Sequence, residues 1–108
     1  MELGTRLLNL RQDQILYFSK DRMAITAHYA NGRVFSWRES MESVKRRVKA
    51  GLFVQNHKSF LTNVLYIQEI RWAEDDIIMN NGDHLPLSRR RARELRSALN
   101  EKIFDHPV

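Results

Sequence analysis

Two short apolar runs enclose a polar segment in the middle of this chain, and this arrangement constrains the fold more than any other feature of the sequence. Phe53 and Val54 open the stretch, and apolar residues recur from Phe60 to Ile67. Short apolar runs are typical of core strands or tight turns. The polar segment from Gln55 to Ser59 is therefore held at both ends, so its side chains have fixed directions. Polar side chains fixed in this way on a loop are candidates for recognition.

The composition fits one folded domain. The chain has 108 residues, of which 43% are hydrophobic, and a single core is feasible at that length without covalent staples. There is no cysteine, which excludes disulfides and thiolate chemistry. No apolar run approaches the ~20 residues that span a membrane, and the N-terminus is unlike a signal peptide. We therefore predict a single cytoplasmic domain over residues 1–108, with its core at about 14–104.

Positive charge is concentrated in two segments. The net charge is +5, from 18 lysines and arginines against 13 acids. Five arginines fall between Arg89 and Arg96, and a second cluster comprises Lys45, Arg46, Arg47 and Lys49. A concentrated positive surface favours polyanions, of which nucleic acid is the commonest. Two solvated helix faces would give the same pattern. Charge alone favours neither polyanion binding nor solvated faces.

Most of the chain is typical of short strands joined by hairpins. Residues 23–29 alternate, which predicts a strand whose buried face carries Met23, Ile25, Ala27 and Tyr29. The polar residues 19–22 are expected to end the strand before it. The expected strands, in chain order, are a weak edge strand at 5–10 and then 15–18, 23–29, 33–37, 66–72, 77–79 and 84–87.

Two Asn-Gly dipeptides mark hairpin turns. Asn31-Gly32 predicts a turn in which both residues have positive φ, and a second turn is expected at 80–83. Pro86 lacks an amide proton, so the strand that contains it should lie at the edge of a sheet or end there.

The periodicity changes in two places to that of a helix. Met41, Val44 and Val48 predict an amphipathic helix over 40–50, capped by Ser40 or by Ser36, with Gly51 as the left-handed residue that ends it. Ser88 is expected to cap a terminal helix that runs to about Phe104. Its apolar stripe would be Ala92, Leu95, Leu99 and Ile103.

Catalytic and metal chemistry have little support. His57 and Ser59 are two residues apart, but a nucleophile with a base also needs an orienting acid and an oxyanion hole. The first acid after them is Glu69, and no glycine-rich turn surrounds Ser59. The four histidines are widely spread, and no pair has ligand spacing. We therefore predict no enzyme, no metal site and no cofactor.

The central stretch resembles a motif of bacterial LytTR-type DNA-binding domains. That motif is Phe-x-x-x-His-[basic or polar]-Ser-[aromatic]-x-x-Asn-x-x-x-Ile, and here it runs from Phe53 to Ile67. A second family block, Asn-Gly followed by apolar-Pro-apolar-Ser-Arg-Arg, stands here at 81–82 and 85–90. The two blocks occur in the family's order, and the resemblance covers about residues 14–103.

The resemblance implies a mainly β fold with two helices, one in mid-chain and one C-terminal, built from short antiparallel sheets arranged end to end in an elongated molecule. The predicted elements by themselves would fit a sandwich or an α+β domain equally well. The resemblance also implies that the chain is part of a bacterial transcription regulator that binds specific sequences of duplex DNA. The contacts would be made in major grooves by loops and by the start of a helix. Family members typically bind direct repeats with two protomers and bend the duplex. Many carry a receiver domain, so a receiver or another partner protein outside this chain is compatible with the resemblance.

The resemblance implies base contacts from His57, Lys58 and one of Arg89 and Arg90. In isolation, His57 would be read as a core histidine bonded to backbone, and only the family pattern favours recognition. The family often has Arg or Asn in place of Lys58, which leaves the preferred base open. Phosphate or variable-loop contacts are expected from Lys20, Arg22, Arg38, Ser88 and Arg91.

Several other residues of the motif are better read as structural. Ser59 and Asn63 can bond backbone and lock the loop that carries His57. Four aromatic residues are expected in the core: Trp37, Phe60, Tyr66 and Trp72. Two alternative functions remain open, namely a module whose basic helix binds an acidic protein, and an RNA or single-strand binder. The second alternative requires exposed aromatic side chains for stacking.

Overall fold

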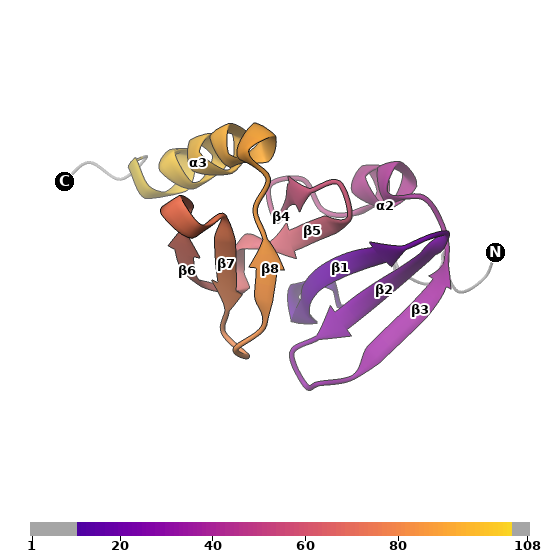
Figure 1. The fold of residues 1–108 in the computed structure, drawn as a ribbon. Helices are drawn as coiled ribbons and strands as arrows, with labels where there is room; N and C mark the ends of the chain where they lie inside the picture. Colours follow the sequence, from indigo (N-terminus) through magenta and orange to yellow (C-terminus); the bar gives the residue numbers. More distant parts are fainter. Residues whose placement is uncertain (1–10, 105–108) are drawn as a thin grey trace.

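Two antiparallel sheets with helices alongside make up the part of the chain that the computed structural model describes, residues 11–104 (Figure 1). The first sheet has the strand order β3-β2-β1-β5-β4, and the second has the order β6-β7-β8. The bounds are β1 Ile15–Asp21, β2 Ala24–Tyr29, β3 Val34–Arg38, α2 Met41–Arg47, β4 Phe53–His57, β5 Phe60–Asn63, β6 Ile67–Arg71, β7 Asp76–Met79, β8 His84–Pro86 and α3 Arg89–Phe104. Single 3-10 turns lie at Gln12–Gln14, Val64–Tyr66 and Trp72–Glu74.

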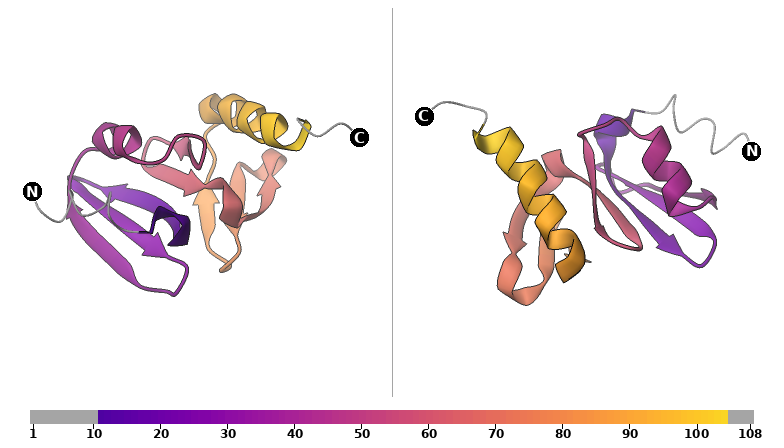
Figure 2. Two further views of the ribbon diagram at one scale, coloured as in Figure 1. Left: turned by 180° about the vertical axis from the view of Figure 1, so that it is seen from behind. Right: turned by 90° about the horizontal axis from the view of Figure 1, so that it is seen from above.

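The two sheets lie end to end, and both helices cover the same side of them (Figures 1 and 2). The molecule measures 45 × 28 × 25 Å along its principal axes. This confirms the predicted mainly β, antiparallel and elongated fold with one helix in mid-chain and one at the end. The edge position predicted for the Pro86 strand is also confirmed, because β8 is the outer strand of the second sheet.

The core has two parts, and β1 contributes to both. Ile15 and Phe18 pack with α2 and the first sheet, whereas Leu16 and Tyr17 pack with the second sheet and α3. Successive strand residues normally face opposite ways, but the register of β1 against β2 shifts between Ile15 and Tyr17. This irregularity lets two consecutive residues face the same core, so β1 is buried on both faces and joins the two halves.

Two strand predictions were wrong at the first turn. β1 continues through Ser19 and Lys20 to Asp21, because these residues pair with β2 and the Lys20 amide also donates to the Ser59 carbonyl at 2.9 Å. Ladder hydrogen bonds outweigh the polar composition there. The turn itself is at Arg22, with φ of 57°, and Met23 lies in it at 60% exposure instead of in the core.

The Asn-Gly turn and the first helix also differ from expectation. Only Gly32 has positive φ, at 88°, while the Asn31 side chain accepts from the Arg33 amide at 2.9 Å. Helix α2 begins after Ser40, whose hydroxyl accepts from the Ser43 amide at 3.1 Å, as predicted. It ends at Arg47 because Val48 is already extended. Gly51, with φ of 82°, therefore serves the turn into β4 and not the helix end.

The second half of the chain follows the prediction more closely. α3 spans the predicted residues, with Leu95 buried and Ala92 and Leu99 packed beside it. β6 is shorter than expected, because 3-10 turns hold Tyr66 and Trp72. The Ile103 side chain and the predicted strand at 5–10 lie outside the described residues. No helix in the described part of the chain is long and apolar enough to cross a membrane.

Candidate nucleic-acid interface

One end of the five-stranded sheet gathers three of the predicted basic positions. Antiparallel pairing brings Arg38, at the end of β3, opposite Ala24 at the start of β2. The Glu39 amide donates to the Met23 carbonyl at 3.2 Å, which holds the end of β3 against the β1–β2 turn. Lys20, Arg22 and Arg38 therefore surround one turn.

The β4–β5 turn, which carries His57 and Lys58, lies beside the same end. The Lys20 amide donates to the Ser59 carbonyl at 2.9 Å, so the tip of β1 is bonded directly to this turn. Lys58 is exposed at the turn, and His57 is half-buried at the end of β4. The structure thus brings His57 and Lys58 next to the β1–β2 turn.

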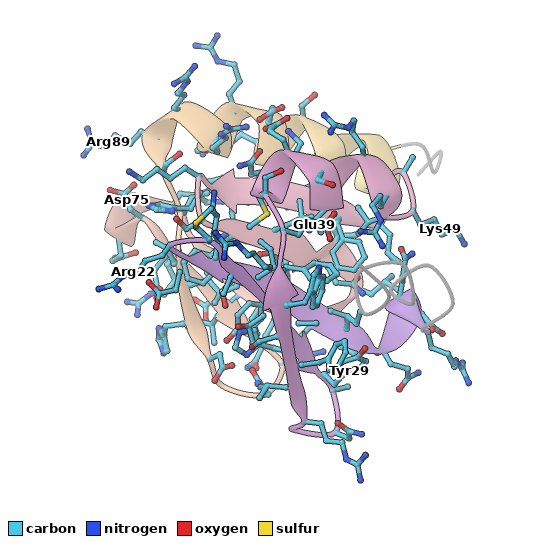
Figure 3. The ribbon with its side chains drawn as sticks, turned by 90° about the vertical axis from the view of Figure 1, so that its right-hand side faces the viewer. Arg22, Tyr29, Glu39, Lys49, Asp75 and Arg89 are labelled. Atoms are coloured by element: carbon cyan, nitrogen blue, oxygen red, sulfur yellow. The ribbon has the colours of Figure 1, made fainter. Side chains whose placement is uncertain are left out.

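The start of α3 is fixed on the other side of β4. The Ser88 amide donates to the Asn56 carbonyl at 2.9 Å, and the Asn56 side chain donates to the Pro86 carbonyl at 2.8 Å. Arg89 and Arg90, the first two residues of α3, therefore lie close to His57. Figure 3 shows Arg22 and Arg89 on one side of the molecule and Lys49 on the opposite side. We call the resulting surface the basic row: Arg38, Arg22, Lys20, Lys58, His57, Arg89 and Arg90.

The His57 ring has a defined tautomer in its neutral form. The Ser59 backbone amide, which can only donate, points at Nδ1 of His57 at 3.1 Å. Nδ1 must therefore be unprotonated, and the proton of neutral imidazole resides on Nε2. The edge of Phe60 contacts the ring, with centroids 5.9 Å apart and planes at 70°. The His57 ring is thus held in place by its neighbours, and its Nε2 is a hydrogen-bond donor.

Asn56 is a key residue of this interface that the sequence did not identify. It is 0% exposed, and its side-chain oxygen accepts from the Thr62 hydroxyl at 2.6 Å. With its second bond to Pro86, it links β4, β5 and the end of β8. A buried amide requires such partners. The sequence predicts a loop for the polar segment that contains Asn56, whereas the structure places Asn56 inside strand β4, where asparagine is disfavoured.

Ser59 and Asn63 were both predicted to bond backbone through their side chains, and the structure confirms this for Asn63 alone. Asn63 bonds backbone through its side chain, donating to the Ile15 carbonyl at 2.9 Å and accepting from the Leu65 amide at 2.9 Å. Ser59 acts through its main chain, which donates to His57 and accepts from Lys20. Ser59 therefore holds the β4–β5 turn in place, whereas Asn63 holds the end of β5 against the start of β1 and caps the 3-10 turn that follows.

The arginines of α3 have different surroundings. The Arg89 Nε lies 3.7 Å from an Asp75 oxygen, although 90% of the Arg89 side chain is exposed. Arg91 pairs with Glu94 at 3.4 Å and is 24% exposed. Arg90 has no ion pair with any side chain that the structure describes. The Ser88 hydroxyl accepts from the Arg91 amide at 3.1 Å, so it caps the helix as predicted.

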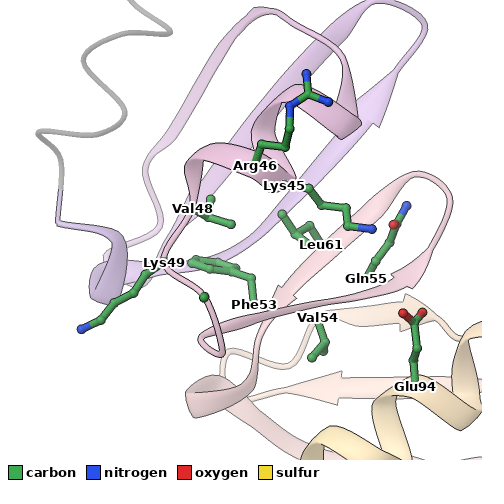
Figure 4. A pocket seen from close by; sticks show the side chains of 10 residues that line it. Lys45, Arg46, Val48, Lys49, Phe53, Val54, Gln55, Leu61 and Glu94 are labelled. Carbon is green, nitrogen blue, oxygen red and sulfur yellow. The ribbon is translucent and has the colours of Figure 1, made fainter.

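The second basic cluster is divided, and its Lys49 lies on the side of the molecule opposite Arg22 and Arg89 (Figure 3). Arg47 is inward, with Nη1 at 2.6 Å from Glu39. Burial opposes ionisation of Glu39, but hydrogen bonds from Ser43, Trp37 and Arg47 outweigh it and lower the pKa of this carboxyl. Lys45, Arg46 and Lys49 instead line a groove of about 340 Å³ between α2, β4 and α3 (Figure 4).

The aromatic side chains are mainly structural. Trp37 is buried, as predicted. Phe60, Tyr66 and Trp72 are partly buried against the second core, and none of the three is exposed. Arg96 stacks over Trp72 at 4.3 Å from the ring centroid. These positions do not provide the exposed aromatic platform that binding of single strands requires.

A polar contact between the two sheets was also not anticipated. The Tyr17 hydroxyl donates to Asp83 at 2.9 Å, and its ring stacks on His28 with centroids 4.1 Å apart. The Ser19 hydroxyl lies 2.8 Å from Nε2 of His28. Burial, and then Asp83, raises the pKa of Tyr17, and burial lowers the pKa of His28. Because Asp83 belongs to the β7–β8 turn, this contact helps to fix the second sheet relative to the first.

Comparisons with known proteins point to one family. The model of a family described as the LytTr DNA-binding domain matches residues 5–100. The sensory transduction protein LytT of Enterococcus faecalis is 30% identical over 74 residues, which cover 66% of this chain and 31% of that protein. LytT of Bacillus subtilis is 31% identical over 64 residues, covering 56% of this chain and 27% of that protein.

A solved structure shows a similar fold. A LytTr DNA-binding domain from Bacillus cereus superposes with a TM-score of 0.75 at 19% identity, covering 83% of this chain and 84% of that one. The chain spans less than a third of the length of the two LytT proteins that it matches. Within residues 11–104, no group of three or more His, Cys, Asp or Glu side chains is placed to hold a metal ion.

Proposed function

This chain belongs to the LytTR DNA-binding domain family, and from that premise we propose that it recognises a specific sequence of duplex DNA through the basic row. The observation that carries the proposal is the placement of two separated segments, the β4–β5 turn and the start of α3, beside each other. The Ser88–Asn56 and Asn56–Pro86 hydrogen bonds fix that placement. A double helix that meets one of these segments can meet the other.

The contacts would come from turns and a helix start, not from a helix lying along a groove. His57 offers a donor at Nε2, which suits the acceptors that purines display in the major groove. Lys58, exposed beside it, can donate to the same edges. One of the two arginines reads a base, and Arg89 has the Asp75 carboxylate as its neighbour. Phosphate contacts are assigned to Lys20, Arg22 and Arg38, with Arg91 and the Ser88 main chain at the helix start.

The dimensions of the molecule are compatible with a larger assembly on DNA. Its long dimension of 45 Å exceeds the ~34 Å of one helical turn. We propose that two protomers bind direct repeats and bend the duplex, as the family pattern implies. A receiver domain or another partner, outside this chain, would then regulate binding.

The proposal is tested by selecting preferred sites from random duplexes and measuring affinity in a salt titration. His57→Ala and the double variant Arg89→Ala with Arg90→Ala should lose discrimination, by ~1–3 kcal/mol for each lost bidentate base contact. Arg38→Ala should weaken all duplexes alike and reduce the salt slope by ~0.9.

Arg33→Ala is the matched control. Arg33 is exposed, follows the β2–β3 turn at the other end of those strands, and carries the same charge. Wild-type discrimination in the His57 and Arg89/Arg90 variants would show that the assigned site is wrong. A wild-type protein that selects no sequence at all would show that the proposed function is wrong.

A second function is favoured by one observation, the groove between α2, β4 and α3. Its rim carries Lys45, Arg46 and Lys49, and the Gln55 side-chain oxygen, buried at its edge, has no hydrogen-bond partner. An acidic protein segment would fit this groove. In that case duplex competitors would not displace the partner, and charge reversal at Lys45 and Lys49 would abolish binding of the protein while leaving DNA affinity intact.

A further inference from the structure

A carboxylate stands in the middle of the surface assigned to DNA. The 3-10 turn Trp72–Glu74 ends in Asp75, which adopts the left-handed conformation with φ of 52° and ψ of 46°. Its amide donates to the Trp72 carbonyl at 3.3 Å, and its carbonyl accepts from the Leu87 amide at 2.9 Å. The main chain therefore holds Asp75 beside Leu87, which lies two residues before the start of α3. Figure 3 shows its side chain between Arg22 and Arg89, on the same side of the molecule.

Three consecutive acids in this turn have three different partners. Glu74 lies 3.7 Å from Arg71, and Asp76 lies 2.8 Å from His84. Asp75 lies 3.7 Å from Nε of Arg89, the first residue of α3. Of these three acids, Asp75 is thus the one whose partner belongs to the basic row.

We propose that Asp75 is a positioning residue for DNA recognition, which orients the Arg89 guanidinium and makes phosphate-only binding less favourable. The inference rests on the proposed function and adds a determinant of specificity to it. Arginine side chains lose much conformational freedom when they read a base, and a fixed carboxylate at Nε restricts that freedom in advance. The terminal nitrogens of the guanidinium remain available for a base or a phosphate.

The same carboxylate penalises unspecific binding. In water, two unit charges ~10 Å apart interact weakly, by an amount equivalent to about a twofold change in affinity. A phosphate near Asp75 is repelled by about this factor on every sequence. Only a sequence that uses the oriented Arg89 recovers the loss. Asp75 should therefore lower affinity for arbitrary DNA and raise it for the preferred site.

The test compares Asp75→Asn with Glu74→Gln. Asparagine is isosteric with aspartate and tolerates the left-handed conformation, so the turn should survive. Glu74→Gln removes the same charge from the neighbouring residue, whose partner is Arg71. Affinities are measured for the duplex that wild-type protein selects and for a scrambled duplex of the same composition, with thermal unfolding to confirm folding.

We expect Asp75→Asn to bind the scrambled duplex about twofold more tightly and to lose about threefold to tenfold of its discrimination. Glu74→Gln should keep its discrimination. In a background of Arg89→Ala, the Asp75→Asn change should cause no further loss of discrimination, because the two residues act as a pair.

The outcomes separate this inference from the proposed function. If wild-type protein selects a site and Asp75→Asn retains full discrimination, or if Glu74→Gln loses as much, the role of Asp75 is refuted while the proposed function stands. The role of Asp75 would also be refuted if Asp75→Asn lost as much discrimination in the Arg89→Ala background as in wild-type protein, since Asp75 would then act without Arg89. A wild-type protein without preference would overturn both.

Discussion

Replacing Asn56 by alanine should destabilise this domain strongly, because Asn56 joins β4 to β5 and to the end of β8 inside the core. Its side chain is 0% exposed and bonds the Pro86 carbonyl at 2.8 Å and the Thr62 hydroxyl at 2.6 Å. Alanine removes both bonds, and it leaves the buried Thr62 hydroxyl and the Pro86 carbonyl without this partner. A buried group without its partner costs ~1–3 kcal/mol and an ordinary lost hydrogen bond ~0.5–1.5 kcal/mol, so we expect the free energy of unfolding to fall by about 2–4 kcal/mol.

Urea unfolding, followed by tryptophan fluorescence and extrapolated linearly to water, measures this change. Asn80→Ala is the matched control, since Asn80 is exposed next to the β7–β8 turn and should change stability by less than ~0.5 kcal/mol. Thr62→Val completes a double-mutant cycle with Asn56→Ala, for which we expect a coupling of ~0.5–3 kcal/mol. A loss below ~1 kcal/mol together with zero coupling would refute the argument that these buried bonds hold the joint.

Two further predictions concern the first sheet and α2. Burial lowers the pKa of His28 in the folded state, so the unfolded chain binds the proton more readily, and stability should fall as the pH drops below the ordinary value of 6.5. Urea midpoints between pH 7.5 and 5 should show this loss, and His28→Gln should reduce it; an unchanged pH dependence in the variant would contradict the assignment to His28. Ser40→Ala removes the cap of α2 and should cost about 1 kcal/mol by the same urea assay, whereas Ser36→Ala, at the rejected cap position, should cost less.

The local features of this fold could be predicted because their causes lie within a few residues. The caps by Ser40 and Ser88 satisfy amides three residues away, and Gly32 supplies the positive φ of its turn. The two helices follow from apolar residues at helical spacing. Where a local signal failed, a more distant contact had outweighed it, as when pairing with β2 and β5 extended β1 through Lys20.

Most of the elements, the family and the residue types that could meet DNA could be inferred from the sequence alone. Which of these residues share a surface depends on contacts between distant parts of the chain, which place Arg47 against Glu39, Asn56 under the start of α3 and Asp75 beside Arg89. The Asn56–Pro86 bond joins residues 30 positions apart. Periodicity and turn signals report interactions between near neighbours along the chain, whereas these contacts depend on how β1, shared by both cores, orients one sheet against the other.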